Sequence, residues 1–317
     1  MNRDDTLSNI DEISTKVTIL SGGVGGARFA RGFEGLPGVN TTVIVNVGDD
    51  ATTHGLPVSP DLDTVLYTLA GLEGPQGWGR ASDTFTANDE LARFGIDNTF
   101  RLGDRDLALK IARLASFGGG ESLSAFARRV AGRLGIRSTV LPATDDRVET
   151  EIRLGSGEWV PFQEYFVTRG HRDTVSEIRF QGDDLASPAP GVIDSIEAAE
   201  VLIIGPSNPP LSIWPILAIP GIRDSVTAHH RTLAVSPLIG GKAVKGPVVE
   251  VMAALGFPPG NTGVLAAYSG LIDKLFVDES DFDPATVAVD GVEIVPGRTL
   301  IVEPDAARDL ASTMMGL

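Results

Sequence analysis

The 317-residue chain contains no cysteine, which excludes disulfide bonds, thiolate metal sites and a cysteine nucleophile. Basic residues are also scarce, because 26 Lys and Arg stand against 42 Asp and Glu and leave a net charge of −16. Nucleic acids and anionic membrane surfaces are both bound through Lys and Arg, so this balance argues against either partner. Long hydrophobic runs are missing too. Residues 213–219 form the longest, and Pro215 interrupts it far below the ~18 residues of a membrane span.

The first fifteen residues, 1–15, are polar and mostly acidic. They lack the basic start and the apolar stretch of a signal peptide, and we therefore predict a disordered tail. Together with the missing cysteine and the missing membrane span, this composition predicts a soluble, cytoplasmic protein.

Short apolar runs bounded by Gly or Pro recur along the chain and are typical of buried parallel strands. They cover residues 16–20, 41–47, 138–141, 201–204, 232–235 and 274–277. Segments with helical periodicity lie between them. Alternating strands and helices predict right-handed βαβ units. We expect an α/β fold with a Rossmann-like, doubly wound, mostly parallel sheet over residues 16–147 and 183–317.

Residues 148–182 break this alternation, because Gly155-Ser156-Gly157 separates two strand-like runs. This pattern predicts a small antiparallel, β-rich insertion that could act as a lid over the main sheet. Near the C-terminus we expect a hairpin within residues 292–302 and a closing helix over residues 304–315.

A glycine-rich loop, Ser21-Gly22-Gly23-Val24-Gly25-Gly26, follows the first predicted strand and leads into a helix. Free N–H groups at a helix start suit a phosphate. No Gly-Lys-Ser/Thr ending follows, so the loop is not a Walker A motif. A dinucleotide fingerprint beginning at Gly23 would need Gly or Ala where Arg28 stands, although an arginine there could reach an anion. The alternative is a glycine-rich turn without a ligand.

Four aspartates, Asp49, Asp50, Asp61 and Asp63, follow the second predicted strand and precede a predicted helix. Hard oxygen ligands beside a phosphate site are typical of Mg²⁺. The alternative for Asp61 or Asp63 is helix capping, which Pro60 and the apolar run after it favour.

Two further segments carry polar side chains at the ends of predicted elements. Residues 99–106 place Arg101, Arg105 and two aspartates around a helix start, where surface ion pairs are the simpler interpretation. Ser207 and Asn208 lie in a loop after the fourth predicted strand and could contact a base or ribose edge, or could only form a tight turn.

Seven segments of the chain form a recognisable set. They are SGGVGGARF (21–29), NVGDD (46–50), SPDLDTVLYTL (59–69), LGDRDLA (102–108), LPATDDRVET (141–150), IGPSNP (204–209) and SPLIGGKAVKGP (236–247). Taken together, these segments resemble the CofD/FbiA family of 2-phospho-L-lactate transferases of deazaflavin coenzyme (F-420) biosynthesis. The resemblance runs in order from residue 16 to the end, and SGGVGGARF is closer to the actinobacterial branch, which is similar to a phosphoenolpyruvate transferase.

The resemblance implies a transferase of substituted phosphate groups that requires Mg²⁺. The donor would be a guanosine-diphospho compound carrying a three-carbon acid, the acceptor the ribityl hydroxyl of the deazaflavin Fo, and GMP a product. Asp63 and Arg101 match Fo-contacting positions, and Asp49 and Asp63 are assigned to the metal, with Asp50 and Asp61 as further candidates. The guanosine diphosphate moiety is assigned to Ser21, Gly22, Gly23, Val24, Gly25, Gly26, Arg28, Ser207 and Asn208.

The hypothesis for the mechanism is that Asp63 orients the attacking ribityl oxygen or accepts its proton. Phospholactate, phosphoenolpyruvate and phosphoglycerate donors remain open. A homodimer is expected, with residues 211–222 as a candidate interface. The rival functions are a non-enzymatic, nucleotide-sugar-binding regulator of the related gluconeogenesis-factor type and a dinucleotide-dependent oxidoreductase, which Arg28 disfavours.

Overall fold

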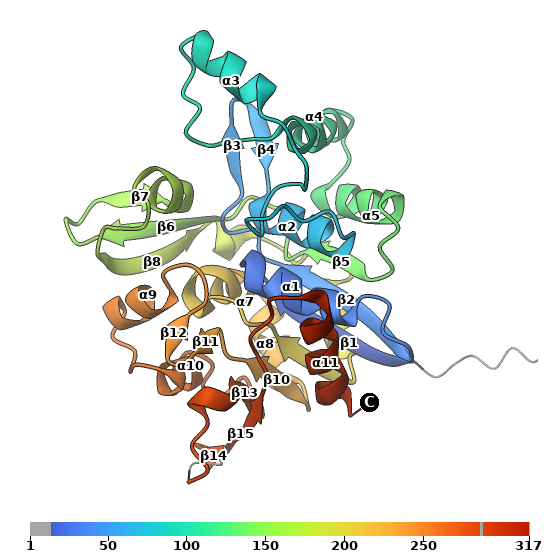
Figure 1. The fold of residues 1–317 in the computed structure, drawn as a ribbon, viewed down its shortest axis with the longest axis vertical. Helices are drawn as coiled ribbons and strands as arrows, with labels where there is room; N and C mark the ends of the chain where they lie inside the picture. Colours follow the sequence, from blue (N-terminus) through green and yellow to red (C-terminus); the bar gives the residue numbers. More distant parts are fainter. Residues whose placement is uncertain (1–13, 286–287, 317) are drawn as a thin grey trace, which may run out of the picture.

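The computed structural model describes residues 14–285 and 288–316, and a large twisted sheet forms its centre (Figure 1). Its strands are β1 (Thr15–Ser21), β2 (Val39–Val45), β5 (Thr139–Pro142), β9 (Val201–Ile204), β10 (Thr232–Val235), β13 (Lys274–Asp278), β14 (Ala288–Val289) and β15 (Val292–Gly297). They lie in the order β14-β15-β13-β10-β9-β1-β2-β5. All six strands expected from the apolar runs are present.

Every pairing in this sheet is parallel except that of the short edge strand β14 with β15. Strands β1 and β9 are buried along most of their length, because helices cover both faces of the sheet. The chain moves outward from β1 through β2 to β5 and then returns to place β9 on the other side of β1. This is the doubly wound order, with its switch point between β1 and β9. The expected α/β fold class is confirmed.

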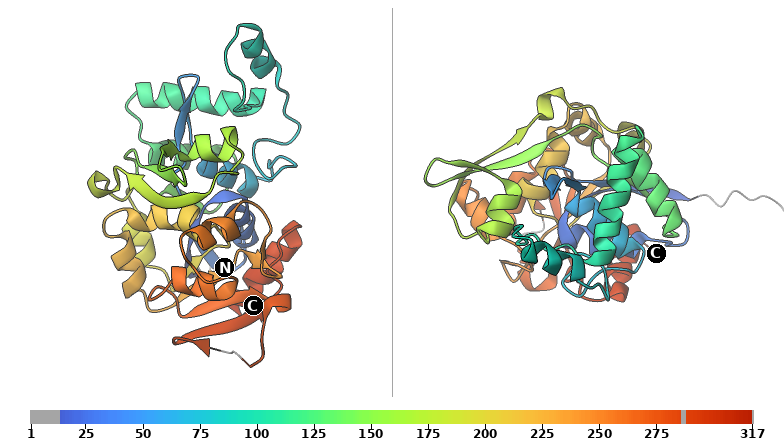
Figure 2. Two further views of the ribbon diagram at one scale, coloured as in Figure 1. Left: turned by 90° about the vertical axis from the view of Figure 1, so that its left-hand side faces the viewer. Right: turned by 90° about the horizontal axis from the view of Figure 1, so that it is seen from above.

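Helices on the two faces connect the strands. They are α1 (Gly23–Phe33), α2 (Pro60–Leu69), α4 (Asp104–Gly118), α5 (Leu123–Arg133), α6 (Val192–Glu197), α7 (Trp214–Ala218), α8 (Ile222–Ala228), α9 (Val248–Ala254), α10 (Asn261–Ala267) and α11 (Pro304–Met315). Helix α1 packs against α2 and the C-terminal α11, whereas α6, α7 and α8 pack together. Figure 2 shows α11 and the α6–α8 group on opposite sides of the sheet. The closing helix is confirmed.

The insertion forms a separate antiparallel sheet in the order β7-β6-β8, as its alternating sequence predicted. Its strands are β6 (Glu149–Leu154), β7 (Trp159–Pro161) and β8 (Val175–Gln181), and the π-helix η1 (Glu164–Thr168) lies between β7 and β8. A small apolar cluster centred on Ile152, Val160 and Tyr165 holds this sheet together, and Val251 of α9 joins it.

Three expectations are wrong in detail. The hairpin placed within residues 292–302 instead joins β14 to β15, with its turn at Asp290 and Gly291, both at positive φ. Thr15 belongs to β1, and the rest of the tail, apart from Ser14, lies outside the described residues. The proposed interface 211–222 is core, because its apolar side chains, among them Ile213 and Ile216, pack under the sheet.

A projecting arm was not foreseen. The hairpin of β3 (Ala51–Thr53) and β4 (Leu56–Val58) and the helix α3 (Thr86–Arg93) extend from the body beside α4 (Figure 1). His54 and Gly55 turn the hairpin, both at positive φ. In the described part of the chain, none of the helices has the length and apolar character needed to cross a membrane.

Candidate active site

A cleft of about 1030 Å³ opens at the carboxyl ends of β1 and β9, which is the switch point of the sheet. Its walls come from the loops after β1, β2, β9 and β10, from α2 and α4, and from the insertion. Pockets for one small molecule are usually about 300–1,000 Å³. The cleft is therefore at the upper end of the size range of ligand sites.

The glycine-rich loop forms the floor of the cleft. Strand β1 ends at Ser21, and α1 begins at Gly23, whose N–H already contacts Asp61. The amides that follow it in the first turn are available to a ligand. A Cβ on Gly22 would lie 2.6 Å from Asp61 Oδ2, and one on Gly25 would lie 2.6 Å from the Pro206 carbonyl oxygen. These two glycines are needed because other parts of the site approach the backbone closely.

Ser207 and Asn208 line the cleft from the loop after β9. The Ser207 hydroxyl donates to the Gly22 carbonyl at 2.8 Å and accepts from the Gly22 N–H at 3.2 Å. Asn208 Oδ1 accepts from the Leu211 N–H at 3.2 Å and caps the turn η3 (Pro209–Ile213). Both side chains therefore fix the loops of the switch point, and Ser207 joins the loop after β1 to the loop after β9.

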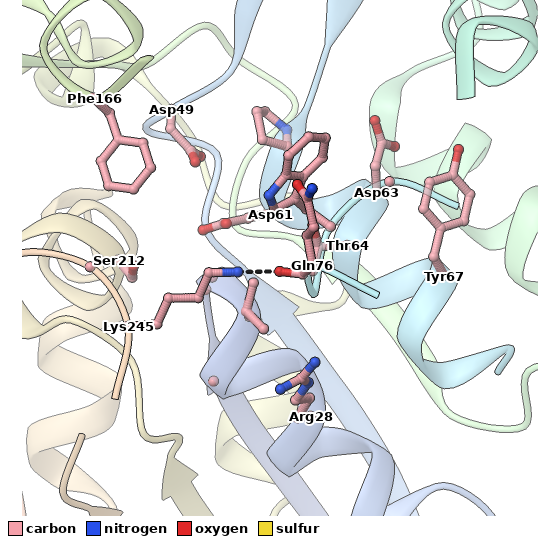
Figure 3. A pocket seen from close by; sticks show the side chains of 18 of the residues that line it. Arg28, Asp49, Asp61, Asp63, Thr64, Tyr67, Gln76, Phe166, Ser212 and Lys245 are labelled. Carbon is pink, nitrogen blue, oxygen red and sulfur yellow. Dashed lines mark hydrogen bonds between the residues drawn. The ribbon is translucent and has the colours of Figure 1, made fainter. Parts of the chain in front are cut away.

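The carboxylates of Asp49 and Asp61 point toward one another in the cleft (Figure 3). Asn46 Nδ2 donates to both carboxylates, at 3.2 Å to Asp49 Oδ1 and 3.0 Å to Asp61 Oδ2. Both aspartates are buried, and no Lys, Arg or His of residues 14–285 and 288–316 forms a salt bridge with either one. The pair thus concentrates negative charge that this part of the protein leaves uncompensated.

Burial, and next the charge of Asp61, raise the pKa of Asp49 well above its usual range. Burial also raises the pKa of Asp61 to about 6, although Asn46 and the Gly23 N–H favour its ionised form. Mg²⁺ in proteins is usually bound by one or two carboxylates and completes its coordination shell with water and phosphate oxygens. Asp49 and Asp61, beside a helix start that suits a phosphate, provide such carboxylates. The residues present therefore fit this ion.

Asp50 lies apart from the cleft. Its Oδ2 accepts from the Ser59 hydroxyl at 2.7 Å, while its buried Oδ1 has no hydrogen-bond partner among the described residues. Burial raises the pKa of Asp50 well above its usual range.

Asp63 is only two residues from Asp61 but belongs to a different environment. Its carboxylate pairs with Arg113 through both oxygens and with Lys110 Nζ at 2.9 Å, and all three side chains are buried. Burial alone would raise the pKa of Asp63, but the charges of Arg113 and Lys110 outweigh burial and hold this pKa below its usual value. Asp63 is consequently a firmly ionised, compensated carboxylate.

The same network extends along α2 and α4. Lys110 also pairs with Asp106, whose Oδ1 accepts from the Tyr67 hydroxyl at 2.8 Å. Asp106, Lys110 and Arg113 were not identified as site residues from the sequence. Their spacing of i, i+4 and i+7 places them on one face of α4, and this charged stripe on an otherwise amphipathic helix was the signal that could have revealed them.

The predicted arginines both line the cleft. Arg28 Nε donates to Glu73 at 2.6 Å, so its charge is already shared with a carboxylate. Arg101 is exposed, lies 3.8 Å from Asp89, and covers the Phe85 ring at 4.4 Å from its centroid. Phe85 lies under Arg101 and Phe100 is its neighbour in the chain, and these two rings form the aromatic end of the cleft. Trp78 also lines the cleft, and Phe162 and Phe166 stack on each other on the wall formed by the insertion.

The insertion contributes directly to the site. Gln163 Nε2 donates to the Asp49 carbonyl at 2.8 Å, and Phe166 points into the cleft opposite Asp49 (Figure 3). The position of the insertion over the cleft agrees with its proposed use as a lid, which stays a prediction.

Known proteins resemble the chain over nearly its whole length. The model of the family described as 2-phospho-L-lactate transferase CofD matches residues 17–305. The chain is 40% identical to the phosphoenolpyruvate transferase of Streptomyces coelicolor, over 95% of this chain and 98% of that protein. It is also 40% identical to the 2-phospho-L-lactate transferase of Methanopyrus kandleri, over 93% of this chain and 96% of that protein.

A solved structure supports the fold. A UPF0052-family protein from Bacillus halodurans superposes with a TM-score of 0.66 at 18% sequence identity, covering 95% of this chain and 99% of that one. At this identity the similarity concerns the architecture alone.

Proposed function

The chain belongs to the CofD family, and we propose on this premise that it transfers a phospho-three-carbon-acid group from a guanosine-diphospho donor to the ribityl hydroxyl of Fo, in coenzyme F-420 biosynthesis. The relatives named phosphoenolpyruvate transferase and 2-phospho-L-lactate transferase have the same identity to this chain. The proposal accordingly states that the transferred group carries a three-carbon acid, and experiment must identify which acid it is.

One observation carries the proposal: a pair of buried carboxylates, Asp49 and Asp61, lies at the start of α1 in a large cleft, without a salt bridge to any described cation. A dinucleotide-dependent oxidoreductase has no use for such a pair, because hydride transfer needs no centre that offsets phosphate charge. Phosphoryl transfer does need one.

In the proposed reaction the ribityl oxygen attacks the phosphorus that bears the three-carbon acid. The new P–O bond forms as the bond to the GMP phosphate oxygen breaks, GMP leaves with the electron pair, and the hydroxyl proton passes to solvent or to a basic group. Such transfers depend on positioning and on charge stabilisation more than on a strong base.

We assign Mg²⁺ to Asp49 and Asp61, where it would offset the charge of the diphosphate. Asp63 is the less suitable second ligand, because both of its oxygens are held by Arg113 and Lys110. The amides at the start of α1 would bind phosphate oxygens, and Ser207 would hold their loop in place.

We assign the acceptor to the aromatic end of the cleft, where Arg101 and Phe85 already stack. A flat ring system fits between aromatic side chains, which also exclude water. For Asp63 we propose orientation of the acceptor and not proton abstraction, because a carboxylate with a lowered pKa is a weak base.

The test is to incubate the protein with Fo, Mg²⁺ and each guanylated donor in parallel, and to measure GMP release. The proposal predicts Mg²⁺-dependent release with at least one donor, and the preferred donor identifies the acid. Binding of Fo is measured by its fluorescence. A protein that binds a nucleotide sugar but not Fo would contradict the transferase and favour the regulatory alternative.

The role of Asp63 has its own test. We expect Asp63→Asn to raise the KM for Fo and to lower turnover at saturating Mg²⁺, with little change in donor KM. Near-normal kinetics for both substrates would exclude Asp63 from the reaction.

A further inference from the structure

Lys245 reaches the cleft from a loop that the assignments above leave unused. The loop follows the short hairpin of β11 (Leu238–Ile239) and β12 (Lys242–Ala243), and its residues Val244–Val248 line the cleft. Lys245 Nζ donates to the Gln76 carbonyl on the opposite wall (Figure 3). The amine thus lies over the cleft and not on the outer surface.

The Lys245 amine lies close to the start of α1. A Cβ on Gly77 would lie 2.5 Å from Val24 Cγ1 and 3.3 Å from Lys245 Nζ, so one point of the loop 74–79 touches both. Arg28, on the next turn of α1, is near enough that its charge adds to partial burial in lowering the pKa of Lys245. The amine is therefore a neighbour of the amides assigned to phosphate.

Most cations of the cleft are already engaged with carboxylates. Lys110 pairs with Asp63 and Asp106, Arg28 with Glu73 at 2.6 Å, and Arg101 with Asp89 at 3.8 Å. Within the described residues that line the cleft, Lys245 and Arg80 have no carboxylate within salt-bridge distance. Arg80 lies over the Tyr67 ring, 5.6 Å from its centroid, toward the acceptor end.

A nucleoside diphosphate brought to this end would meet Asp49 and Asp61, which repel it. A cation in addition to the assigned Mg²⁺ is needed to balance the charge, and Lys245 is the free one beside α1. Its side chain is also solvent-exposed and held only by a backbone carbonyl, which is a weaker partner for an ammonium group than a phosphate.

We propose that Lys245 binds the diphosphate of the donor, exchanging its hydrogen bond to the Gln76 carbonyl for one to a phosphate oxygen. This inference rests on the proposed function, since it identifies the residue that completes the donor site. It makes Lys245 a specificity-determining residue for phosphate, and the loop 244–248 a wall of the donor end.

The test is calorimetric titration of GDP and, separately, of guanosine into the Mg²⁺-loaded protein. We compare the wild type with Lys245→Met, which keeps the length of the side chain, and with Lys245→Arg, which keeps its charge. Lys242→Met is the matched control, because Lys242 lies on the same hairpin, is exposed and does not line the cleft.

We expect Lys245→Met to weaken GDP binding about 10- to 100-fold, the usual effect of losing one charge-assisted hydrogen bond. Guanosine binding should change less than about twofold, Lys245→Arg should recover most of the GDP affinity, and Lys242→Met should match the wild type. An unchanged Kd for GDP in Lys245→Met, or equal losses for GDP and guanosine, would overturn the proposal, since equal losses indicate a structural role.

A panel of nucleoside diphosphates separates this proposal from the proposed function. If the wild type binds another nucleoside diphosphate and not GDP, the guanylated donor is wrong, and Lys245 is tested with the diphosphate that binds. If the wild type binds GDP and Lys245→Met does not weaken it, the inference fails while the transferase stands. If the wild type binds no nucleoside diphosphate, both fail.

Discussion

Two groups of aspartates in one cleft have opposite electrostatic environments. Asp49 and Asp61 both accept from the amide of Asn46, have no salt bridge to a described Lys, Arg or His, and have raised pKa values. Asp63 pairs with Lys110 and Arg113, Asp106 pairs with Lys110, and the pKa of Asp63 is lowered. The described residues supply no cation to the first group, whereas the second receives its cations from α4.

The contrast arises from helix geometry. Asp61 and Asp63 both lie in the first turn of α2, but two residues along a helix correspond to about 200° of rotation. One side chain therefore faces the start of α1, and the other faces α4. Adjacent carboxylates in a sequence cannot be assigned the same role until the faces that they occupy are known.

The largest expected effect comes from breaking the uncompensated group. Asp61→Asn or Asp49→Asn should reduce Mg²⁺-dependent GMP release by about 10²- to 10³-fold, because the offset of diphosphate charge would be lost. Stability should be unchanged or higher, since a buried charge without a cation is removed. Asp50→Asn is the control, because Asp50 does not line the cleft. The turnover of this variant should stay within a few fold of the wild type.

Breaking the compensated group should instead cost stability. Arg113→Met leaves Asp63 with one cation in a buried site, and we expect a loss of about 3–5 kcal/mol in the free energy of unfolding. Denaturant titration monitored by circular dichroism measures it. Arg129→Met is the comparison, because Arg129 is half-exposed and pairs with Glu121, and losing an exposed pair should change stability little. A similar small loss for Arg113→Met would contradict the compensation.

The pH dependence of stability should separate the two groups. Because the pKa of Asp61 is about 6 in the folded protein and lower when unfolded, the folded state binds more protons between pH 7 and 5 and becomes more stable as the pH falls. The gain from Asp61 alone is about 1.4 kcal/mol over this range. The pKa of Asp63 is lowered in the folded protein, so the contribution of Asp63 to stability is constant between pH 7 and 5 and is lost only below about pH 4.

Thermal unfolding of the metal-free protein at pH 7 and pH 5 measures this difference. Protonation of other carboxylates also relieves the overall negative charge and stabilises both proteins. The relevant quantity is therefore the gain in stability of the wild type between pH 7 and pH 5 minus the same gain for Asp61→Asn. Saturating Mg²⁺ should remove that excess by keeping Asp61 ionised. An equal gain in both proteins would mean that Asp61 titrates normally.

The smallest effect is expected from Tyr67→Phe, which removes one hydrogen bond to Asp106 while Lys110 still pairs with it. We expect a loss of about 1 kcal/mol in stability and little change in donor binding. A loss as large as that of Arg113→Met would show that the hydroxyl, and not the cations, holds the network together.

Most of the sheet could be predicted because buried parallel strands are short apolar runs, and all six of the expected runs are strands. The helices between them could be predicted from their helical periodicity. The loop after β1 and the four aspartates were also found from the sequence, since Gly and Asp mark strand ends plainly. The partition of the aspartates could not be found, because it depends on Lys110 and Arg113, about fifty residues away. The arm and Lys245 were missed for the same reason: only packing brings these loops to the cleft.

The two hydrogen bonds between Ser207 and Gly22 join residues 185 positions apart. The glycine-rich loop is complete in the first tenth of the chain, but its shape depends on a strand that is formed from residues beyond 200. Contacts across such a separation form late in folding, because a long loop must close first. The donor site therefore exists only in the finished domain, and a growing or truncated chain that ends before β9 carries the loop without the site.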